Sequence, residues 1–316
     1  TGIYDFIILP IIDHLLKVDS FNLNEEEAQE ALSSKFYNIA LYGTVPVQIG
    51  FVVWFLFLIS TKELSNLELF AKTFSMGAMG SVLAINSAHE IGHRTTTINK
   101  FLSKLLLTSV LYVHFFEEHN YGHHKNVGTY DDPATARRGE WLYVFVIRSI
   151  VFGWIGAWKI EHKRLTRNGG SALSIKNEVL TWQLIQLGVL SLIYIIFGTT
   201  VLCCFALASF ISVFILEAIN YIEHYGLSRE KVNEFRYEKV NPSHSWNADN
   251  QVGRAVLFEL TRHSDHHESP SKPYQILESP DESPQLPTGY PGMILLSLLP
   301  PLFFLIMHKR MKLYNS

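Results

Sequence analysis

The chain has 316 residues, of which 48% are hydrophobic and only 17% are charged, and its formal net charge is −3 at pH 7. The balance is close to neutral and no basic stripe indicates a nucleic-acid-binding protein, so we expect no nucleic-acid partner. Soluble domains do not gather apolar residues into long uncharged runs, so we predict one all-α domain over residues 1–316, built as a polytopic bundle of transmembrane helices.

The first apolar runs predict membrane helices. Residues 3–16 follow no charged leader and no cleavage site, so we interpret them as the end of a membrane helix whose beginning precedes Thr1 rather than as a signal peptide. Residues 37–59 carry no charge and are long enough for a hydrocarbon core of about 30 Å. Residues 67–88 form the next predicted span, with Glu68 and Lys72 near its start.

The later runs are more varied. Residues 101–116 are short and residues 141–158 contain Arg148, so both are predicted to lie at the membrane interface. Residues 179–217 are interrupted by FGTT at 197–200, which predicts two helices joined by a tight turn. Residues 268–292 are rich in proline and should be extended, and residues 290–308 should pack or lie at the interface.

Lys and Arg are concentrated between residues 100 and 176, whereas the loop at residues 60–66 carries only Lys62. Because positively charged loops face the cytoplasm, this stretch and everything after Asn220 are predicted to lie on the cytoplasmic side.

Nine of the fourteen histidines fall in four short clusters, each beside an apolar run. Residues three or four apart share one face of a helix, and neutral imidazole suits iron, zinc and copper. Nine ligands are too many for one ion and fit two. The predicted metal ligands are His89, His93, His119, His123, His124, His224, His263, His266 and His267.

The remaining features set limits on this interpretation. Glu90 gives HEIGH the pattern of a zinc metalloprotease helix, but that site would leave most of the histidines without a role. Cys203 and Cys204 are adjacent and cannot form a spaced thiolate site, so an electron-transfer centre of that kind must sit on another protein. No metal is assigned to the isolated histidines: His14, His114, His162, His244 and His308.

Several longer sequence motifs indicate which protein family the chain resembles. "NSAHEIGHR", "FFEEHNYGHHKNVGTYDDPATARRGE", "NYIEHYGL", "HSWNAD", "LTRHSDHHESPSKPYQIL" and "LPTGYPG" resemble the bacterial alkane 1-monooxygenases of the integral-membrane di-iron desaturase and hydroxylase superfamily. The match extends over essentially the whole chain, although Arg94 stands where lysine is usual, Gly128 where alanine is usual, and the family has further helical sequence in front.

The resemblance implies a six-helix fold in the bacterial inner membrane with a di-iron site on its cytoplasmic side. It implies O2-dependent hydroxylation of a terminal methyl group, with electrons from rubredoxin, its reductase and NADH, and it carries the metal ligands over onto the nine histidines. No catalytic residue is expected beyond these ligands. Glu118, Glu223 and Asp265, which stand next to them, are expected to hydrogen-bond the rings.

Two other functions stay open. A fatty-acyl desaturase or hydroxylase on the same scaffold would need a polar pocket for a carrier headgroup, and a metal-storage or transport protein would place ligands along its spans. For a monooxygenase, the surface on which an acidic donor docks is expected to include Lys125, Arg137, Arg138, Lys163 and Arg164.

Overall fold

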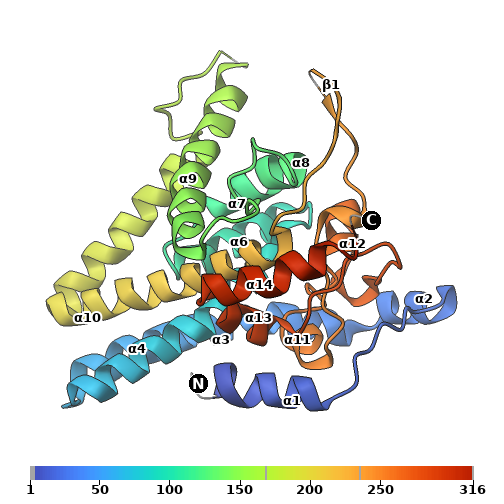
Figure 1. The fold of residues 1–316 in the computed structure, drawn as a ribbon. Coiled ribbons are helices and arrows are strands. Elements are labelled where there is room, and N and C mark those ends of the chain that lie inside the picture. The colour runs from blue at the N-terminus through green and yellow to red at the C-terminus, as the bar shows by residue number, and fades with distance from the viewer. Residues whose placement is uncertain (1–3, 168, 235, 315–316) are drawn as a thin grey trace. The chain divides into compact units, whose positions relative to one another are not determined.

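The computed structural model describes residues 4–167, 169–234 and 236–314, and almost all of its regular elements are helices (Figure 1). The chain divides into two compact units, and each is described by itself. Among the described residues, unit 1 comprises 38–122 and 153–216, and unit 2 comprises 4–37, 123–152 and 217–314.

In chain order, the helical elements of residues 4–224 are η1 (Tyr4–Ile8), α1 (Leu9–Leu15), α2 (Glu25–Ser33), α3 (Lys35–Thr61), α4 (Asn66–Gly80), η2 (Ser81–Asn86), α5 (Ser87–Gly92), α6 (Thr97–Thr108), α7 (Phe115–Glu118), η3 (His119–His123), α8 (His124–Asn126), α9 (Leu142–Thr166) and α10 (Glu178–His224). The later elements are β1 (Lys231–Asn233), β2 (Arg236–Tyr237), η4 (Pro242–His244), α11 (Gln251–Val256), α12 (His263–Glu268), η5 (Tyr274–Ile276), α13 (Tyr290–Ser297) and α14 (Pro300–Met311). The strands β1 and β2 form one antiparallel hairpin.

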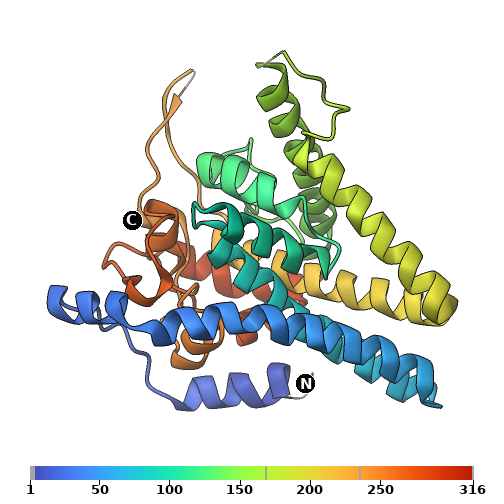
Figure 2. The same ribbon diagram turned by 180° about the vertical axis from the view of Figure 1, so that it is seen from behind.

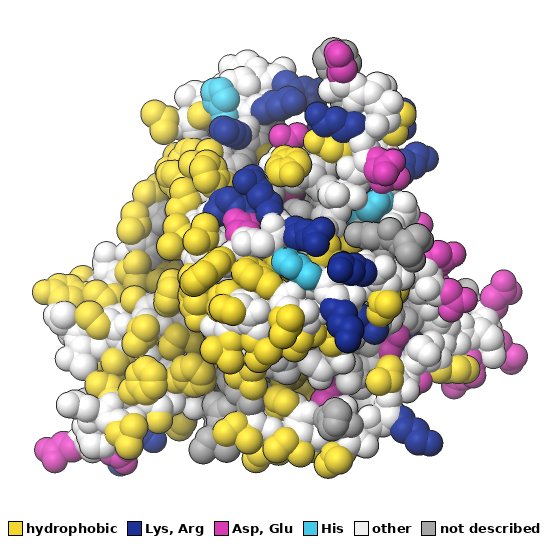
Figure 3. All heavy atoms as spheres, in the orientation of Figure 1, with side chains coloured by type: hydrophobic (Ala, Val, Ile, Leu, Met, Phe, Trp, Pro, Cys, Tyr) yellow, Lys and Arg dark blue, Asp and Glu magenta, His cyan; other side chains and the backbone are white. Residues whose placement is uncertain are grey.

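Three of the described helices, α3, α9 and α10, are long and apolar enough to cross a membrane. The chain is therefore a membrane protein by the length and composition of its helices. Hydrophobic side chains cover the visible surface of α9 and α10 (Figure 3), and Ile147 and Ile195 are among the most exposed of them. A large apolar surface of this kind is unfavourable in water and favourable in lipid.

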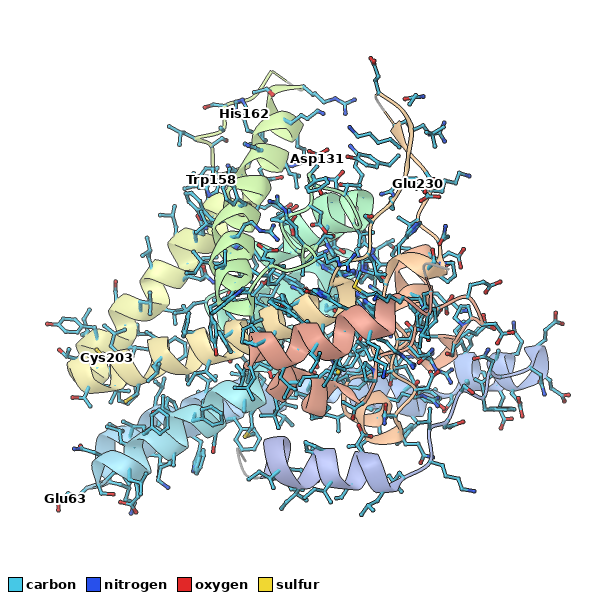
Figure 4. All side chains as sticks on the ribbon, in the orientation of Figure 1. Glu63, Asp131, Trp158, His162, Cys203 and Glu230 are labelled. Carbon is cyan, nitrogen blue, oxygen red and sulfur yellow. The ribbon has the colours of Figure 1, made fainter. Side chains whose placement is uncertain are left out.

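The predicted break in α10 is confirmed. Gly198 has φ +81° inside FGTT, a left-handed backbone conformation that favours glycine, and the helix turns back on itself there (Figure 1). Cys203 lies near the corner where the two arms meet (Figure 4).

Helix α9 differs from the prediction. It is 25 residues long and apolar enough to cross a membrane, whereas residues 141–158 were predicted to lie at the interface. Arg148, which argued for the interface, is neutralised: its Nε and Nη2 atoms each donate a 2.7 Å hydrogen bond to the Glu140 carboxylate. Its Nη1 atom donates to the Pro133 carbonyl.

The run at residues 67–88 is also divided in an unexpected way. Ser65 and Glu68 form a reciprocal capping box that starts α4, as expected for a helix N-terminus. The helix then passes through the π-helical turn η2 before α5 begins at Ser87. The apolar α-helix is therefore shorter than predicted.

The core of unit 1 lies where α3, α4 and both arms of α10 meet. Phe55, Met76, Ile193 and Phe205 are buried there, and α3 and α4 run side by side in both ribbon views (Figures 1 and 2). Gly77 lets α4 approach α10 closely enough for the Ser212 hydroxyl to donate a 2.8 Å hydrogen bond to the Gly77 carbonyl.

The C-terminal part of unit 2 agrees with prediction in part. The proline-rich stretch after α12 contains turns, bends and the short 3-10 helix η5, so it is irregular and not extended throughout as predicted. An isolated bridge joins Asn247 and Gln285. The helices α13 and α14 are short, and neither is among the three candidate spans.

Candidate metal centre

Three of the predicted ligands converge in unit 1. His89 lies on α5, His93 follows its last residue, and His119 begins η3. Their candidate ligand atoms lie within 4.8 Å of one another, and the Nε2 atoms of His93 and His119 are 3.3 Å apart. The spacing of four residues places His89 and His93 on one face of the helix, as the sequence predicted.

The segment that carries His89 and His93 is held firmly against α6. The Ser103 hydroxyl donates a 2.7 Å hydrogen bond to the Ala88 carbonyl, and a Cβ atom at Gly92 would lie 3.0 Å from that hydroxyl. The π-helical turns η2 and η3 precede or carry these histidines, and such turns occur often at functional sites because they redirect the side chains that follow.

Four further predicted ligands form a histidine quartet in unit 2: His123, His224, His263 and His267. Their Nε2 atoms make a chain of short separations, 3.2 Å from His123 to His267, 2.9 Å from His267 to His263, and 3.1 Å from His263 to His224. All four side chains are buried. The rings come from the end of η3, the end of α10, and α12.

The last two predicted ligands, His124 and His266, also lie together in unit 2. Their Nε2 atoms are 3.2 Å apart. His266 lies beside His267 on α12, and His124 follows His123 at the start of α8.

The quartet fits a metal ion bound through Nε2. Metal–nitrogen bonds of about 2.1 Å place neighbouring ligand atoms about 3 Å apart at right angles, and the separations in the quartet have this size. A neutral imidazole has one N–H and one lone pair, so a ring whose Nδ1 donates elsewhere presents the Nε2 lone pair to an ion.

His123 has such a donor arrangement. Its Nδ1 lies 2.9 Å from Oδ2 of Asp132, which also accepts a 2.5 Å hydrogen bond from the Thr135 hydroxyl. Burial opposes ionisation of Asp132, but the neighbouring His123 ring and the Thr135 hydroxyl outweigh it and hold the pKa of this carboxyl below its ordinary value. Carboxylates of this kind fix the orientation of metal-bound histidines.

Sequence reasoning missed Asp132. The available signal was that Asp132 lies in the same sequence motif as His123, nine residues after it.

His267 is suited to metal binding by its neutral state. Burial, followed by the neighbouring rings of His263 and His124, holds its pKa well below the ordinary value for histidine. A neutral ring keeps the lone pair that a metal ion requires.

Glu223 is close to the quartet, but not in the expected way. Its Oε2 lies 3.3 Å from Nε2 of His263, the same atom that faces the other rings. Its Oε1 accepts a 2.8 Å hydrogen bond from the Tyr290 hydroxyl. Glu223 therefore places a carboxylate oxygen beside the candidate metal-binding nitrogen, and Tyr290 is a further site residue that the sequence did not reveal.

The other two acidic residues take different positions. Asp265 accepts a 2.7 Å hydrogen bond from the Glu278 backbone N–H and forms a 2.8 Å ion pair with Lys272, so it fixes the segment after α12, and its expected bond to a ring stays a prediction. The Glu118 side chain lies against Gly153 and Gly156 of α9, where an added Cβ atom would be in van der Waals contact with its Cγ atom, at 3.8 and 3.4 Å. Its predicted bond to a ring stays a prediction.

The metalloprotease pattern is not supported by the geometry around Glu90. This residue forms an ion pair with Arg94, 3.6 Å long, and Arg94 also donates a 2.8 Å hydrogen bond to the Asn38 side chain. Glu90 is thus part of a structural charge pair, which does not suit a general base.

The isolated histidines have other environments. His114 is buried, and burial lowers its pKa to about 4. His162 is exposed on α9 (Figure 4), His244 lies 3.1 Å from Glu238, and the His308 ring meets the Tyr225 hydroxyl at 2.9 Å. The side chain of His14 lies outside the described residues.

One of the basic residues expected to face a donor is engaged within the chain. Arg164 makes two hydrogen bonds with Glu161, of 2.5 and 2.8 Å, and donates a third to the Lys176 carbonyl. Arg137 and Arg138 are exposed in unit 2, as predicted.

Comparison with known proteins identifies the family. The fatty acid desaturase family model matches residues 68–296. An alkane 1-monooxygenase of Ectopseudomonas oleovorans is 39% identical over 299 residues, which cover 95% of this chain and 74% of the relative. An alkane 1-monooxygenase of Acinetobacter baylyi is 38% identical, with 96% of this chain and 74% of the relative covered.

A more distant relative acts on different compounds by its name. The xylene/toluene monooxygenase hydroxylase component of Pseudomonas putida is 26% identical over 98% of this chain and 81% of the relative. The stronger matches cover almost the whole of this chain, including all nine histidines. The chain therefore belongs to the fatty acid desaturase family and, within it, to the alkane 1-monooxygenases.

Proposed function

We propose that this chain hydroxylates the terminal methyl group of medium- to long-chain n-alkanes with O2, at two iron ions bound by the nine histidines. Rubredoxin supplies the electrons, which it receives from NADH through its reductase. The observation that carries the proposal is the buried quartet, whose Nε2 atoms converge within hydrogen-bonding distances of one another. The stoichiometry is alkane, O2, two electrons and two protons in, and 1-alkanol and water out.

Iron bound by these rings supplies the oxidising power to break a terminal C–H bond, which is too strong and too apolar for acid–base catalysis. The quartet is proposed to hold one of the two ions, and the nine histidines together are the candidate ligands of both. Asp132 orients His123, and burial keeps His267 neutral. Tyr290 donates to Glu223 and holds its carboxylate beside His263.

The membrane context supports an apolar substrate. An n-alkane dissolves in the hydrocarbon of the bilayer, and the three candidate spans present apolar surface to it. Because an alkane offers no hydrogen-bonding group, its chain length is selected by the shape of an apolar passage. The histidines are proposed to face the cytoplasm, on the side where Lys and Arg are concentrated.

The test is aerobic incubation of membranes that contain the full protein with octane, rubredoxin, its reductase and NADH, followed by gas chromatography. We expect 1-octanol, dependent on each component, and none from membranes with the His267→Ala variant. Formation of a double bond in an added fatty-acyl substrate, without octanol, would support the desaturase alternative instead.

The metal content is a separate test. Purified protein from iron-replete cells should contain about two iron atoms per chain, because nine imidazoles exceed what one ion can bind. A content near one, or zinc in place of iron, contradicts the di-iron proposal whatever the activity assay shows.

A further inference from the structure

The side chain of Trp246 links the histidine quartet to the surface of unit 2. Its ring is fully buried, and its indole N–H donates a 3.0 Å hydrogen bond to the Tyr225 carbonyl. Its backbone N–H donates a 2.8 Å hydrogen bond to the Glu223 carbonyl. These two carbonyls flank His224, so Trp246 is bonded to the backbone on both sides of a quartet residue.

The outer side of Trp246 meets a partly exposed aromatic residue. The ring of Tyr314 packs edge-on against Trp246, with centroids 5.6 Å apart, and Tyr314 is 40% exposed. Tyr314 is fixed by its own contacts: its hydroxyl accepts a 3.1 Å hydrogen bond from the Gln285 backbone N–H, and the Arg310 guanidinium lies over its ring. A path therefore runs from solvent through the Tyr314 and Trp246 rings and two hydrogen bonds to the backbone of Glu223 and Tyr225, the covalent neighbours of His224.

The surface around the outer end of this path is basic. Arg310 belongs to a group with Arg137, Arg138, Lys309 and Lys312, and none of the five forms an ion pair with a carboxylate among the described residues. Lys and Arg side chains gather over the part of unit 2 where α14 ends (Figure 3). Met311 contacts the same region as Arg138, at Gly226. Cations that lack a carboxylate partner attract an acidic macromolecule.

We propose that electrons enter the quartet through Tyr314 and Trp246, from a small acidic one-electron carrier protein that docks on this basic surface. The inference rests on the proposed function, which requires external electrons and assigns iron to the quartet. In each transfer, one electron leaves the reduced carrier and converts one ferric ion to ferrous. Two such transfers supply the two electrons that one O2 requires. No bond forms or breaks along the path. Neither aromatic residue is oxidised or reduced, because the rings only shorten the distance through which the electron tunnels.

The path is tested with full-length, iron-loaded protein in nanodiscs. Reduced rubredoxin is mixed anaerobically with the oxidised enzyme, and its oxidation is followed by its visible absorbance in a stopped-flow instrument. We expect Tyr314→Leu to slow transfer at saturating carrier by about tenfold, and Tyr314→Phe to retain the normal rate because the ring is kept. Iron content and carrier affinity should not change in either variant.

Tyr237→Leu is the matched control, because it removes a tyrosine that Arg229 and Lys231 overlie in the β1–β2 hairpin. This variant should transfer electrons normally. Trp246→Phe, which keeps an aromatic ring but loses the N–H, should slow transfer with unchanged iron content, and thereby separates conduction from folding.

The docking surface has its own measurement. Lys309→Glu with Lys312→Glu should raise the dissociation constant of rubredoxin severalfold and reduce its dependence on salt, whereas Lys62→Glu in the α3–α4 turn should not. Equal transfer rates in the wild type and Tyr314→Leu, with octanol formed by both, would overturn the path alone. Normal electron transfer without any alkanol would overturn the proposed function and leave the path standing.

Discussion

The Asp132 carboxylate lies 2.9 Å from Nδ1 of His123, while Nε2 of the same ring lies 3.2 Å from Nε2 of His267. One side of the imidazole is thus fixed by a buried anion, and the other side faces the quartet. A metal-bound histidine usually has this arrangement, with one ring nitrogen bonded to a carboxylate and the other directed at the metal.

Asp132→Asn should therefore weaken metal binding. The amide can orient the ring but carries no charge to favour the Nδ1–H tautomer, and changes of this kind lower metal affinity by about 10- to 100-fold. Iron retained after dialysis against a competing chelator measures the effect. Asp131→Asn, at the neighbouring exposed aspartate (Figure 4), is the control and should retain iron like the wild type.

Removing a quartet ring should have a larger effect than removing an isolated one. His123→Ala or His267→Ala should abolish octanol formation and lower the iron content, because each deletes a buried ligand. His162→Ala removes an exposed ring on α9 and should leave most of the activity. Loss of activity in His162→Ala at normal protein level would show that the set of nine ligands is incorrectly drawn.

The contact between α4 and α10 should be sensitive to one methyl group. A Cβ atom at Gly77 would lie 2.6 Å from Cβ of Ile211 and 2.8 Å from the Ala208 carbonyl oxygen, neither of which is the end of a flexible side chain. Gly77→Ala should lower the free energy of unfolding by about 1–3 kcal/mol, seen as a lower midpoint in thermal unfolding in detergent.

Gly50→Ala on α3 is the matched control for Gly77→Ala. Nothing lies within 4 Å of the added Cβ atom at Gly50, so the same change should be neutral or slightly stabilising through its helix propensity. Equal destabilisation by the two changes would contradict the close approach of α4 and α10.

His114 should make stability depend on pH. Burial lowers its pKa from 6.5 to about 4 in the folded chain, so between these values the unfolded chain binds more protons than the folded one. The free energy of unfolding should therefore fall as the pH drops from about 6.5 to about 4, by roughly 3 kcal/mol.

The contribution of His114 is isolated by substitution. His114→Gln should flatten the fall of the thermal unfolding midpoint over this pH range, whereas His162→Gln, at an exposed position, should not. An unchanged pH profile in His114→Gln would mean that another group carries the dependence.

Sequence reasoning identified what depends on local spacing. Eight of the nine histidines stood out because their intervals place rings on shared helix faces, whereas His224 stands alone and entered the set through its place beside an apolar run and the family resemblance. The break in α10 was found because FGTT interrupts an uncharged run. Both signals lie within a few residues. The quartet itself confirms the clustering of His123, His224, His263 and His267, although metal binding stays a prediction.

What the sequence did not reveal depends on contacts between distant or non-helical segments. The charge of Arg148 led to the prediction that its helix lies at the interface. Its partners, Glu140 and the Pro133 carbonyl, could not be recognised from the sequence because only the folded loop before α9 brings them to it. The bond from Tyr290 to Glu223 joins residues 67 positions apart. The ion pair of Asp265 with Lys272 was also not revealed by the sequence, because Lys272 reaches Asp265 only through the fold of the segment after α12.

The quartet has a consequence for how the protein is made. Its rings come from positions as much as 144 residues apart. His123 is therefore synthesised long before His267 leaves the ribosome. An ion bound by all four rings cannot be captured until α12 has been translated, so insertion of the earlier helices into the bilayer must precede metallation. Cells short of iron should therefore accumulate the complete, membrane-inserted chain without its metal, and such a chain could be activated later without new synthesis.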